Sequence, residues 1–362
     1  MIPRIVNQTE ATSGPNQTQL AGNRNKIING AMMIDQRNAG ASVTPASGQY
    51  LVDRWVYFGS QTSKFTAQQN AGAVTPPVGF TNYQGLTVAA AYTVTATDYF
   101  LIRQPIEGLN CSDLAWGTAS AKSVTLSFWV YSSLTGTFGG VLNNNGQSRS
   151  YPFTYSIASA NTWTYITITI PGDTTGTWLT TNGIGIMVSF GLGVGSTYSG
   201  TAGSWSGGAY NSATGATSVI GTNGATFYIT GVQLEKGSVA TPFENRQYGT
   251  ELALCQRYCF VNKPSSLNAP FGSGIQYSTG LALYYAVMPI TMRSAPSVAY
   301  SALADFNVVN ASANLTPTLI SINGANPNSV RLDITVVGAT AGQGSIISAA
   351  TTSAALTYSA EL

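Results

Sequence analysis

Histidine is absent from this 362-residue sequence. Without an imidazole, the chain lacks the base of Ser-His-Asp and Cys-His sites and the commonest ligand for zinc and non-haem iron. Its three cysteines, Cys111, Cys255 and Cys259, are too few to close a structural zinc site by themselves. Any catalysis is therefore restricted to carboxylates, a lysine nucleophile, or magnesium or calcium on oxygen ligands.

Charge is also scarce, since charged residues make up 8% of the chain and the net charge is +2. An ordinary soluble domain has about 25% charged residues, so uncharged Ser, Thr, Asn, Gln and Gly must cover this surface. No basic stripe is present to hold nucleic acid, and we expect no nucleic-acid partner. Hydrophobic residues still make up 44%, which excludes intrinsic disorder.

Long hydrophobic runs are missing too. No window reaches about 18 consecutive apolar residues, so we expect no membrane insertion. The first residues lack the apolar core of a secretory signal, which predicts folding in a cytoplasm with reduced thiols. Cys255 and Cys259, four residues apart in a helix-like segment, are interpreted as small core residues, with a redox or metal pair as the alternative.

What the chain does contain is a series of short β-branched and aromatic segments separated by turn residues. This pattern predicts an all-β fold, a jelly-roll sandwich. Residues 124–131 alternate between an aliphatic face and a face that ends in Trp129 and Tyr131. The strands expected in the sandwich are 27–34, 50–58, 99–106, 123–131, 162–170, 184–194 and 226–234.

One segment, residues 248–259, has a helical pattern. Thr250 can cap a helix, and Leu252, Cys255 and Cys259 would share one face, so a helix is expected over 251–259. Further strands are expected after it, at 281–289, 298–301, 318–322 and 330–337. The division predicted is an extended docking arm at 1–25, the jelly roll at 26–246, a helical connector at 247–260, and a smaller β domain at 261–362.

Several short motifs between about residues 27 and 300 match a known family. The most specific are Val-Gln-Leu-Glu-Lys-Gly at 232–237 and Leu-Cys-Gln-Arg-Tyr at 254–258. Together the motifs resemble a module of bacteriophage tail fibres and virion spikes, in which a carbohydrate-binding-module-like jelly roll precedes a receptor-facing β domain. The motifs are residues 29–30, 35–37, 53–55, 104–108, 122–130, 230–244, 251–258 and 292–296.

This resemblance implies a virion protein that is assembled in the host cytoplasm, forms a homotrimer, and contacts host surface polysaccharide. Residues 1–25 would dock on other virion proteins, and no cofactor is implied. A purely structural head-decoration, collar or adaptor protein is the alternative. We expect no enzyme: a glycan depolymerase is disfavoured because no motif pairs two carboxylates for glycoside hydrolysis.

Aromatic residues in turn-rich loops are the candidate glycan contacts, because sugar rings stack on exposed aromatic faces. The candidates are Trp178, Tyr198, Trp205 and Tyr210, of which the last three share a long glycine-rich loop. Such loops are uncommon without a function or an interface, so subunit contact and loop anchoring are the alternatives.

The remaining tryptophans in strand patterns, Trp55, Trp129 and Trp163, are expected in the core. Among the acidic residues, Asp53 with Arg54 and Glu107 are expected to fix strand ends. Glu235 and Glu244 are expected at a solvated hairpin end.

Members of the resembled family often hold a structural calcium ion on carboxylates of an early and a late strand. Residues 30–33 and 228–232 occupy those positions here and contain no carboxylate. Calcium needs six to eight oxygen ligands, so we expect no metal site.

Overall fold

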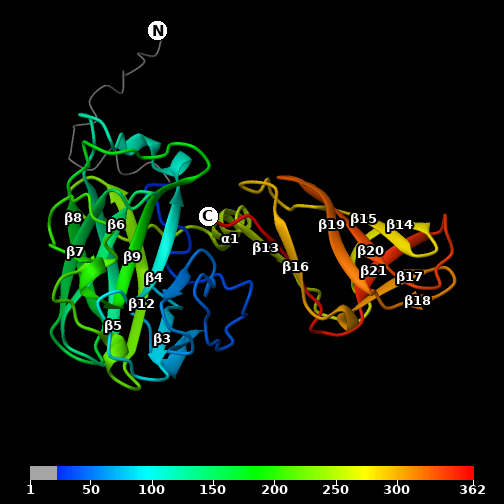
Figure 1. Cartoon of the computed structure of the whole chain (residues 1–362), viewed down its shortest axis with the longest axis horizontal. Helices are drawn as coiled ribbons and strands as arrows, with labels where there is room; N and C mark the ends of the chain where they lie inside the picture. Colours follow the sequence, from blue (N-terminus) through cyan, green and yellow to red (C-terminus); the bar gives the residue numbers. More distant parts are fainter. Residues whose placement is uncertain (1–22) are drawn as a thin grey trace, which may run out of the picture.

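The computed structural model describes residues 23–362, which form two β domains joined by a helix. Residues 1–22 lie outside the described residues, so the docking arm at 1–25 stays a prediction. Figure 1 shows the sandwich at one end of the molecule and the C-terminal domain at the other. Between them lie α1, Tyr248–Gln256, and β13, Cys259–Asn262. No helix in the described part is long and apolar enough to cross a membrane.

The first domain is a sandwich of two five-stranded antiparallel sheets, as the sequence predicts. Sheet A has the strand order β2-β3-β12-β5-β8, and sheet B has the order β1-β4-β9-β6-β7. One core of buried aliphatic and aromatic side chains fills the space between them. The strands are β1 Val56–Gly59, β2 Phe65–Gln69, β3 Gln84–Val88, β4 Tyr99–Glu107, β5 Val124–Ser132, β6 Gly136–Asn143, β7 Ser150–Ile157, β8 Thr164–Ile170, β9 Ile184–Val194 and β12 Thr226–Lys236.

Strand β5 shows how the alternating pattern builds this core. Its side chains point alternately to the two faces of sheet A, and the aliphatic set at 124, 126, 128 and 130 is fully buried. Trp129 and Tyr131 therefore emerge on the outer face of the sheet, where both are half-buried.

The outer face of sheet B is covered by the chain itself. Strand β10, Ser199–Gly200, pairs in parallel with β11, Ser212–Ala213, and β11 packs on β6, β7 and β9. Arg103 of β4 donates a hydrogen bond to Asn211 at 2.9 Å, which ties this loop to the sheet. The outer face of sheet A is left more open.

The C-terminal domain has its own core and two sheets, which agrees with a second, smaller β domain. A seven-stranded sheet has the order β18-β17-β21-β14-β15-β20-β19, and a three-stranded sheet has the order β13-β22-β16. Their strands are β14 Pro270–Ser278, β15 Leu281–Val287, β16 Ser297–Tyr300, β17 Phe306–Asn310, β18 Asn314–Leu315, β19 Leu319–Asn326, β20 Ser329–Thr335, β21 Gly344–Ala349 and β22 Leu356–Ser359.

Two expectations about local structure are wrong. Residues 27–34 form no strand, because Asn29 and Met32 have left-handed backbone conformations with φ of 56° and 55°. The Asn29 side chain holds this turn by donating to Ile34 O at 2.8 Å. The helix begins at Tyr248 and ends at Gln256, so Thr250 lies inside it and Cys259 belongs to β13. Cys255 and Cys259 are fully buried, which confirms that they are core residues.

The two domains meet through charged residues expected to fix strand ends. Glu107 of β4 pairs with Arg257 at 2.6 Å and accepts a hydrogen bond from Tyr258 at 2.6 Å. Burial alone would raise the pKa of Glu107, but these two donors outweigh it and lower the pKa. Glu107 therefore joins the sandwich to the segment after α1. The sequence of β4 alone does not indicate this long-range contact.

Candidate functional site

An open cavity of about 300 Å³ lies on the outer face of sheet A. Its floor is formed by Ser127 and Trp129 of β5 and by Gly231 of β12, and Tyr165 of β8 stands at its rim. Two loop segments complete the lining. We call this site the aromatic cavity; its lining residues are Val78, Gly79, Phe80, Ser127, Trp129, Tyr165, Gly231, Pro242, Phe243 and Asn245.

Trp129 and Tyr165 form an aromatic pair in the lining of the aromatic cavity. They are direct cross-strand partners in the pairing of β5 with β8, and their ring centroids lie 5.2 Å apart at an interplanar angle of 44°. Tyr165 is 44% exposed, and Trp129 is half-buried. Two large aromatic surfaces are thus held in fixed orientation on a rigid sheet and remain open to solvent.

A second part of the lining is aromatic as well and depends on a glycine. Phe80 and Phe243 make an edge-to-face contact at 5.1 Å. Gly231 has φ of 61°, where β12 shifts register, and a Cβ there would lie 2.6 Å from Phe80 Cζ and 3.2 Å from Trp129 Cδ1. Glycine is therefore required here both by the backbone conformation and by the close approach of the two rings.

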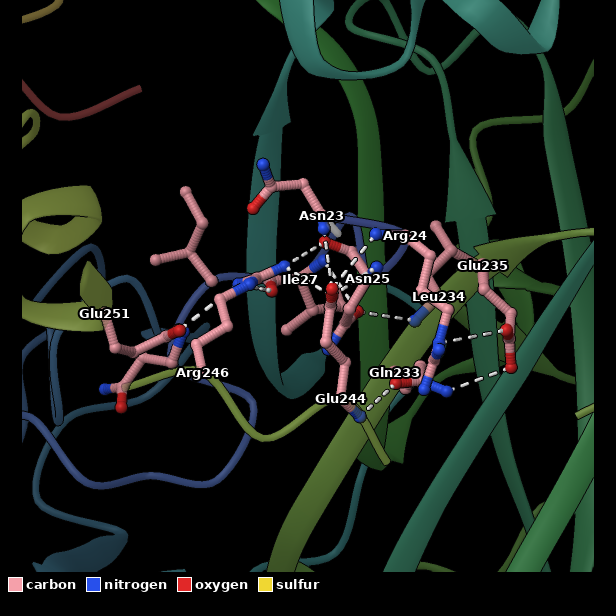
Figure 2. A network of polar contacts seen from close by, with 12 residues as sticks. Asn23, Arg24, Asn25, Ile27, Gln233, Leu234, Glu235, Glu244, Arg246 and Glu251 are labelled. Atoms are coloured by element: carbon pink, nitrogen blue, oxygen red, sulfur yellow. Dashed lines mark hydrogen bonds and ion pairs between the residues drawn. The ribbon is translucent and has the colours of Figure 1, made fainter. Parts of the chain in front are cut away.

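A polar network fixes the segment that carries Phe243 and Asn245 (Figure 2). Glu244 lies between Phe243 and Asn245 in the sequence. Its carboxylate accepts hydrogen bonds from Asn23 N at 2.6 Å and Asn25 N at 2.9 Å. Burial would raise the pKa of Glu244, but these amides and the nearby guanidinium of Arg246 outweigh it and lower the pKa. The cavity wall is therefore anchored to the N-terminal segment through Glu244.

The same network continues on both sides of Glu244. Arg246 donates to Ile27 O at 3.1 Å and pairs with Glu251 of α1 at 3.2 Å. Glu235 is fully buried and accepts hydrogen bonds from the backbone and hydroxyl of Thr241 at 2.8 and 2.6 Å. The expectation that Glu235 and Glu244 lie at a solvated hairpin end is wrong. Both carboxylates instead accept hydrogen bonds from neighbouring segments of the chain.

Four further aromatic rings lie beside the aromatic cavity on the outer face of sheet A. Tyr131 and Tyr228 stack at 5.2 Å with an interplanar angle of 5°, and Tyr83 stacks on Tyr228 at 5.1 Å. Trp163 packs against this group and donates to Thr75 O at 2.9 Å. The loop at 70–75 covers part of this group, so it forms a small satellite core.

Trp129 lies outside the main core, which corrects the expectation for it, and Trp163 packs against the small satellite core instead of the main one. Trp55 is fully buried as expected. Sequence reasoning missed Trp129 as a surface candidate although the alternation at 124–131 already separates it from the aliphatic face. Assigning tryptophans in strands to the core overrode that signal.

Two of the predicted glycan contacts, Trp178 and Trp205, lie together elsewhere on the sandwich. Their rings and that of Trp116 form a mutual edge-to-face cluster with centroid separations of 4.7 to 5.4 Å. Trp178 donates to Thr175 O at 3.1 Å and Trp205 to Pro171 O at 2.8 Å. Both half-buried rings thus anchor their loops, and glycan contact by them stays a prediction.

The other two predicted contacts, Tyr198 and Tyr210, lie in the glycine-rich loop over sheet B. Tyr198 packs edge-to-face on Tyr99 at 5.7 Å. The ring of Tyr210 lies on the backbone of Gly200, where a Cβ would come within 2.3 Å of it. The structure does not bring these tyrosines into one site with Trp178 and Trp205, and their role in glycan contact also stays a prediction.

The chemistry available in the aromatic cavity is uncharged. No acidic or basic side chain is among its lining residues, and its polar groups are the Ser127 hydroxyl, the Asn245 amide and the Tyr165 phenol. Within residues 23–362, no group of three or more Cys, Asp and Glu side chains is placed to hold a metal ion. The arrangement is suited to binding an uncharged molecule that has apolar faces and hydroxyl groups.

No protein-family model matches the chain, and no curated protein matches it in sequence. Among solved structures, the chain is similar to the enzymatically active domain of tailspike protein 4 of bacteriophage CBA120, with a TM-score of 0.33 and 14% identity over 59% of this chain and 22% of that one. The similarity thus spans about a fifth of that tailspike chain.

Two smaller proteins are matched over almost their whole length. One is TmCBM61 in complex with β-1,4-galactotriose, with a TM-score of 0.31 and 11% identity over 59% of this chain and 99% of that one. The other is a putative sugar binding protein from Bacteroides thetaiotaomicron, with a TM-score of 0.31 and 12% identity over 59% of this chain and all of that one. These low scores leave function to be argued from this chain's own residues.

Proposed function

We propose that this chain is a phage virion appendage protein, a fibre or spike component that adsorbs to uncharged host surface glycan through the aromatic cavity. The observation that carries the glycan part is the pair Trp129 and Tyr165, whose rings are held 5.2 Å apart on the open face of sheet A. The virion part is supported by the motif resemblance, above all residues 232–237 and 254–258.

The cavity has the features that recognition of an uncharged sugar requires. The C–H faces of a pyranose ring stack on Trp129 and Tyr165, while Ser127 and Asn245 supply hydrogen bonds to its hydroxyl groups. Its volume of about 300 Å³ is at the lower end for ligand sites, which suits a short glycan segment. One such site binds weakly, so adsorption relies on several sites acting together on the particle.

We propose that the aromatic cavity binds glycan and does not cleave it. Glycoside hydrolysis uses two carboxyl groups on either side of the scissile bond, and the lining of the aromatic cavity contains none. The alternative of a head-decoration, collar or adaptor protein would require another subunit to cover Trp129 and Tyr165 in the particle.

Glycan arrays carrying host capsule and lipopolysaccharide fragments test the binding site. Trp129→Ala and Tyr165→Ala should each lower affinity at least about tenfold, because each removes a stacking surface. Trp205→Ala is the comparison variant and should keep the affinity while losing thermal stability. Loss of affinity in Trp205→Ala at unchanged stability would move the site to the glycine-rich loop.

Electron microscopy of intact particles, with an antibody against residues 261–362, tests the virion role separately. Label at the tip of a tail or head appendage is the expected result. Label spread evenly over the capsid shell would assign the chain to decoration, and its absence from particles would contradict the virion role while leaving the array result unaffected.

A further inference from the structure

Strand β8 is the one edge of the sandwich that the described chain leaves uncovered. Each five-stranded sheet has two edges, so the sandwich has four edge strands, β1, β2, β7 and β8. Three of them carry an extra β-bridge to a neighbouring loop: Tyr50 to Val56 on β1, Val43 to Ala67 on β2, and Ser206 to Ser150 on β7. Within residues 23–362, β8 pairs with β5 alone and has no such bridge.

The sequence of β8 also lacks the residues that normally protect an edge. Thr164–Ile170 reads Thr-Tyr-Ile-Thr-Ile-Thr-Ile, and no charged residue occurs between Arg149 and Asp173. Natural proteins guard long edges with lysine, proline or a bulge, since the free backbone groups otherwise recruit another strand. The pairing of β8 with β5 is regular over seven residues, so no bulge turns its outer edge away.

We propose that β8 pairs antiparallel with β8 of a second copy, about a two-fold axis at Thr167. This register places Thr167 opposite its own equivalent, Tyr165 opposite Thr169, and Ile166 opposite Ile168. A second copy fits because the centre of the strand is self-complementary: Thr167 meets its own equivalent and Ile166 meets Ile168, and with no charge present, two copies do not repel each other.

Burial along β8 agrees with a missing neighbour on this side. Ile166 and Ile168 face the core but are only half-buried, whereas the inward residues of β5 are fully buried. A strand added beyond β8 would cover these side chains and join the two A sheets into one of ten strands. Figure 1 shows β7 and β8 on the side of the sandwich turned away from the C-terminal domain, which leaves room for the second sandwich.

The pairing would place two aromatic cavities on one surface. Tyr165 lies two residues from the axis, so the two copies of Tyr165 would be about 14 Å apart along the strands, at roughly 3.4 Å per residue. This consequence rests on the proposed glycan function, but the pairing itself does not. The contact is isologous and closes at two copies, so it differs from the three-fold assembly that the motif resemblance implies.

A cysteine at the axis tests the register. Thr167→Cys should form a covalent dimer under mild oxidation, because Cα atoms of facing antiparallel residues lie about 4.5–5.5 Å apart, within the range for a disulfide. The native thiols give little background: all three are buried, and burial raises the pKa of Cys111 and of Cys259 to about 12.

Two matched variants make the result specific. Thr154→Cys places a thiol at an exposed threonine of the neighbouring edge strand β7, and Thr169→Cys places one on β8 that would face Tyr165. Neither should cross-link appreciably. Equal cross-linking of all three variants, or none in Thr167→Cys, would overturn the proposal.

Solution mass supplies an independent test that does not depend on oxidation. The wild-type chain of 37.7 kDa should sediment as a dimer, and Thr167→Lys, which places two like charges at the axis, should sediment as a monomer with an unchanged circular dichroism spectrum. A dimer or trimer that persists in Thr167→Lys would overturn the pairing. So would a wild-type monomer that dimerises only after removal of residues 1–22, since that result would assign the edge to those residues.

Discussion

Glu361, the penultimate residue of the chain, forms a buried ion pair with Arg54 of the sandwich. Their side chains are 8% and 1% exposed. Arg54 also lies over the ring of Tyr258 at 3.6 Å and donates to Pro105 O at 2.6 Å. Glu361 follows β22, and Tyr258 directly precedes β13, so Arg54 of the sandwich contacts residues at both ends of the C-terminal domain.

Glu361→Gln should lower the free energy of unfolding by about 3 kcal/mol, since it leaves the buried guanidinium of Arg54 without its counter-charge. Urea denaturation followed by circular dichroism measures this loss. Asp113→Asn is the control, because Asp113 pairs with Lys26 at 2.8 Å but is 46% exposed, and surface pairs contribute little. Equal effects of the two substitutions would contradict the role of burial.

Asp53 predicts a pH dependence of stability. Burial raises its pKa from 3.8 to about 6, although Arg37 at 3.9 Å and hydrogen bonds from Gln36 act in the opposite direction. The folded state therefore binds a proton more tightly than the unfolded state. The contribution of Asp53 is fully present below about pH 4 and is lost as pH rises through about 6.

Comparison with Asp53→Asn, which does not titrate, isolates this effect. The free energy of unfolding of the wild type minus that of Asp53→Asn should fall by about 2–3 kcal/mol between pH 4 and pH 7, at about 1.4 kcal/mol per unit of pKa shift. Denaturation at each unit of pH measures the difference. A difference that rises with pH would mean that the pKa of Asp53 is lowered in the folded protein.

Gly231→Ala should close the aromatic cavity and destabilise the sandwich, because the new Cβ would meet Phe80 at 2.6 Å. Gly224→Ala is a matched control: Gly224 has φ of 74°, and its Cβ would meet nothing within 4 Å, so it carries the backbone cost without the clash. We expect a loss of about 1 kcal/mol in the control and about 1–3 kcal/mol more in Gly231→Ala. Thermal unfolding measures stability, and equal losses would show that the rings move aside freely.

Local patterns were sufficient for part of the fold. The period of two at 124–131 identifies β5 and the face that each of its side chains occupies, because a strand alternates regardless of its partners. The same logic failed at 27–34, where apolar residues lie in a turn held by the Asn29 side chain and left-handed backbone. The Asn29 side chain donates to the carbonyls of Ile34 and Asp53, and such side-chain hydrogen bonds leave no periodic trace in a sequence.

The sequence by itself determined the chemical limits of this protein: no imidazole, little charge, an all-β chain and buried thiols. Only the tertiary structure decided which aromatics are open to solvent. The aromatic cavity joins residues of β5, β8 and β12, Trp129 among them, with loops at 78–80 and 242–245, whereas Trp205 packs against the main core. Burial depends on contacts between segments far apart in the chain, and composition and spacing do not specify those contacts.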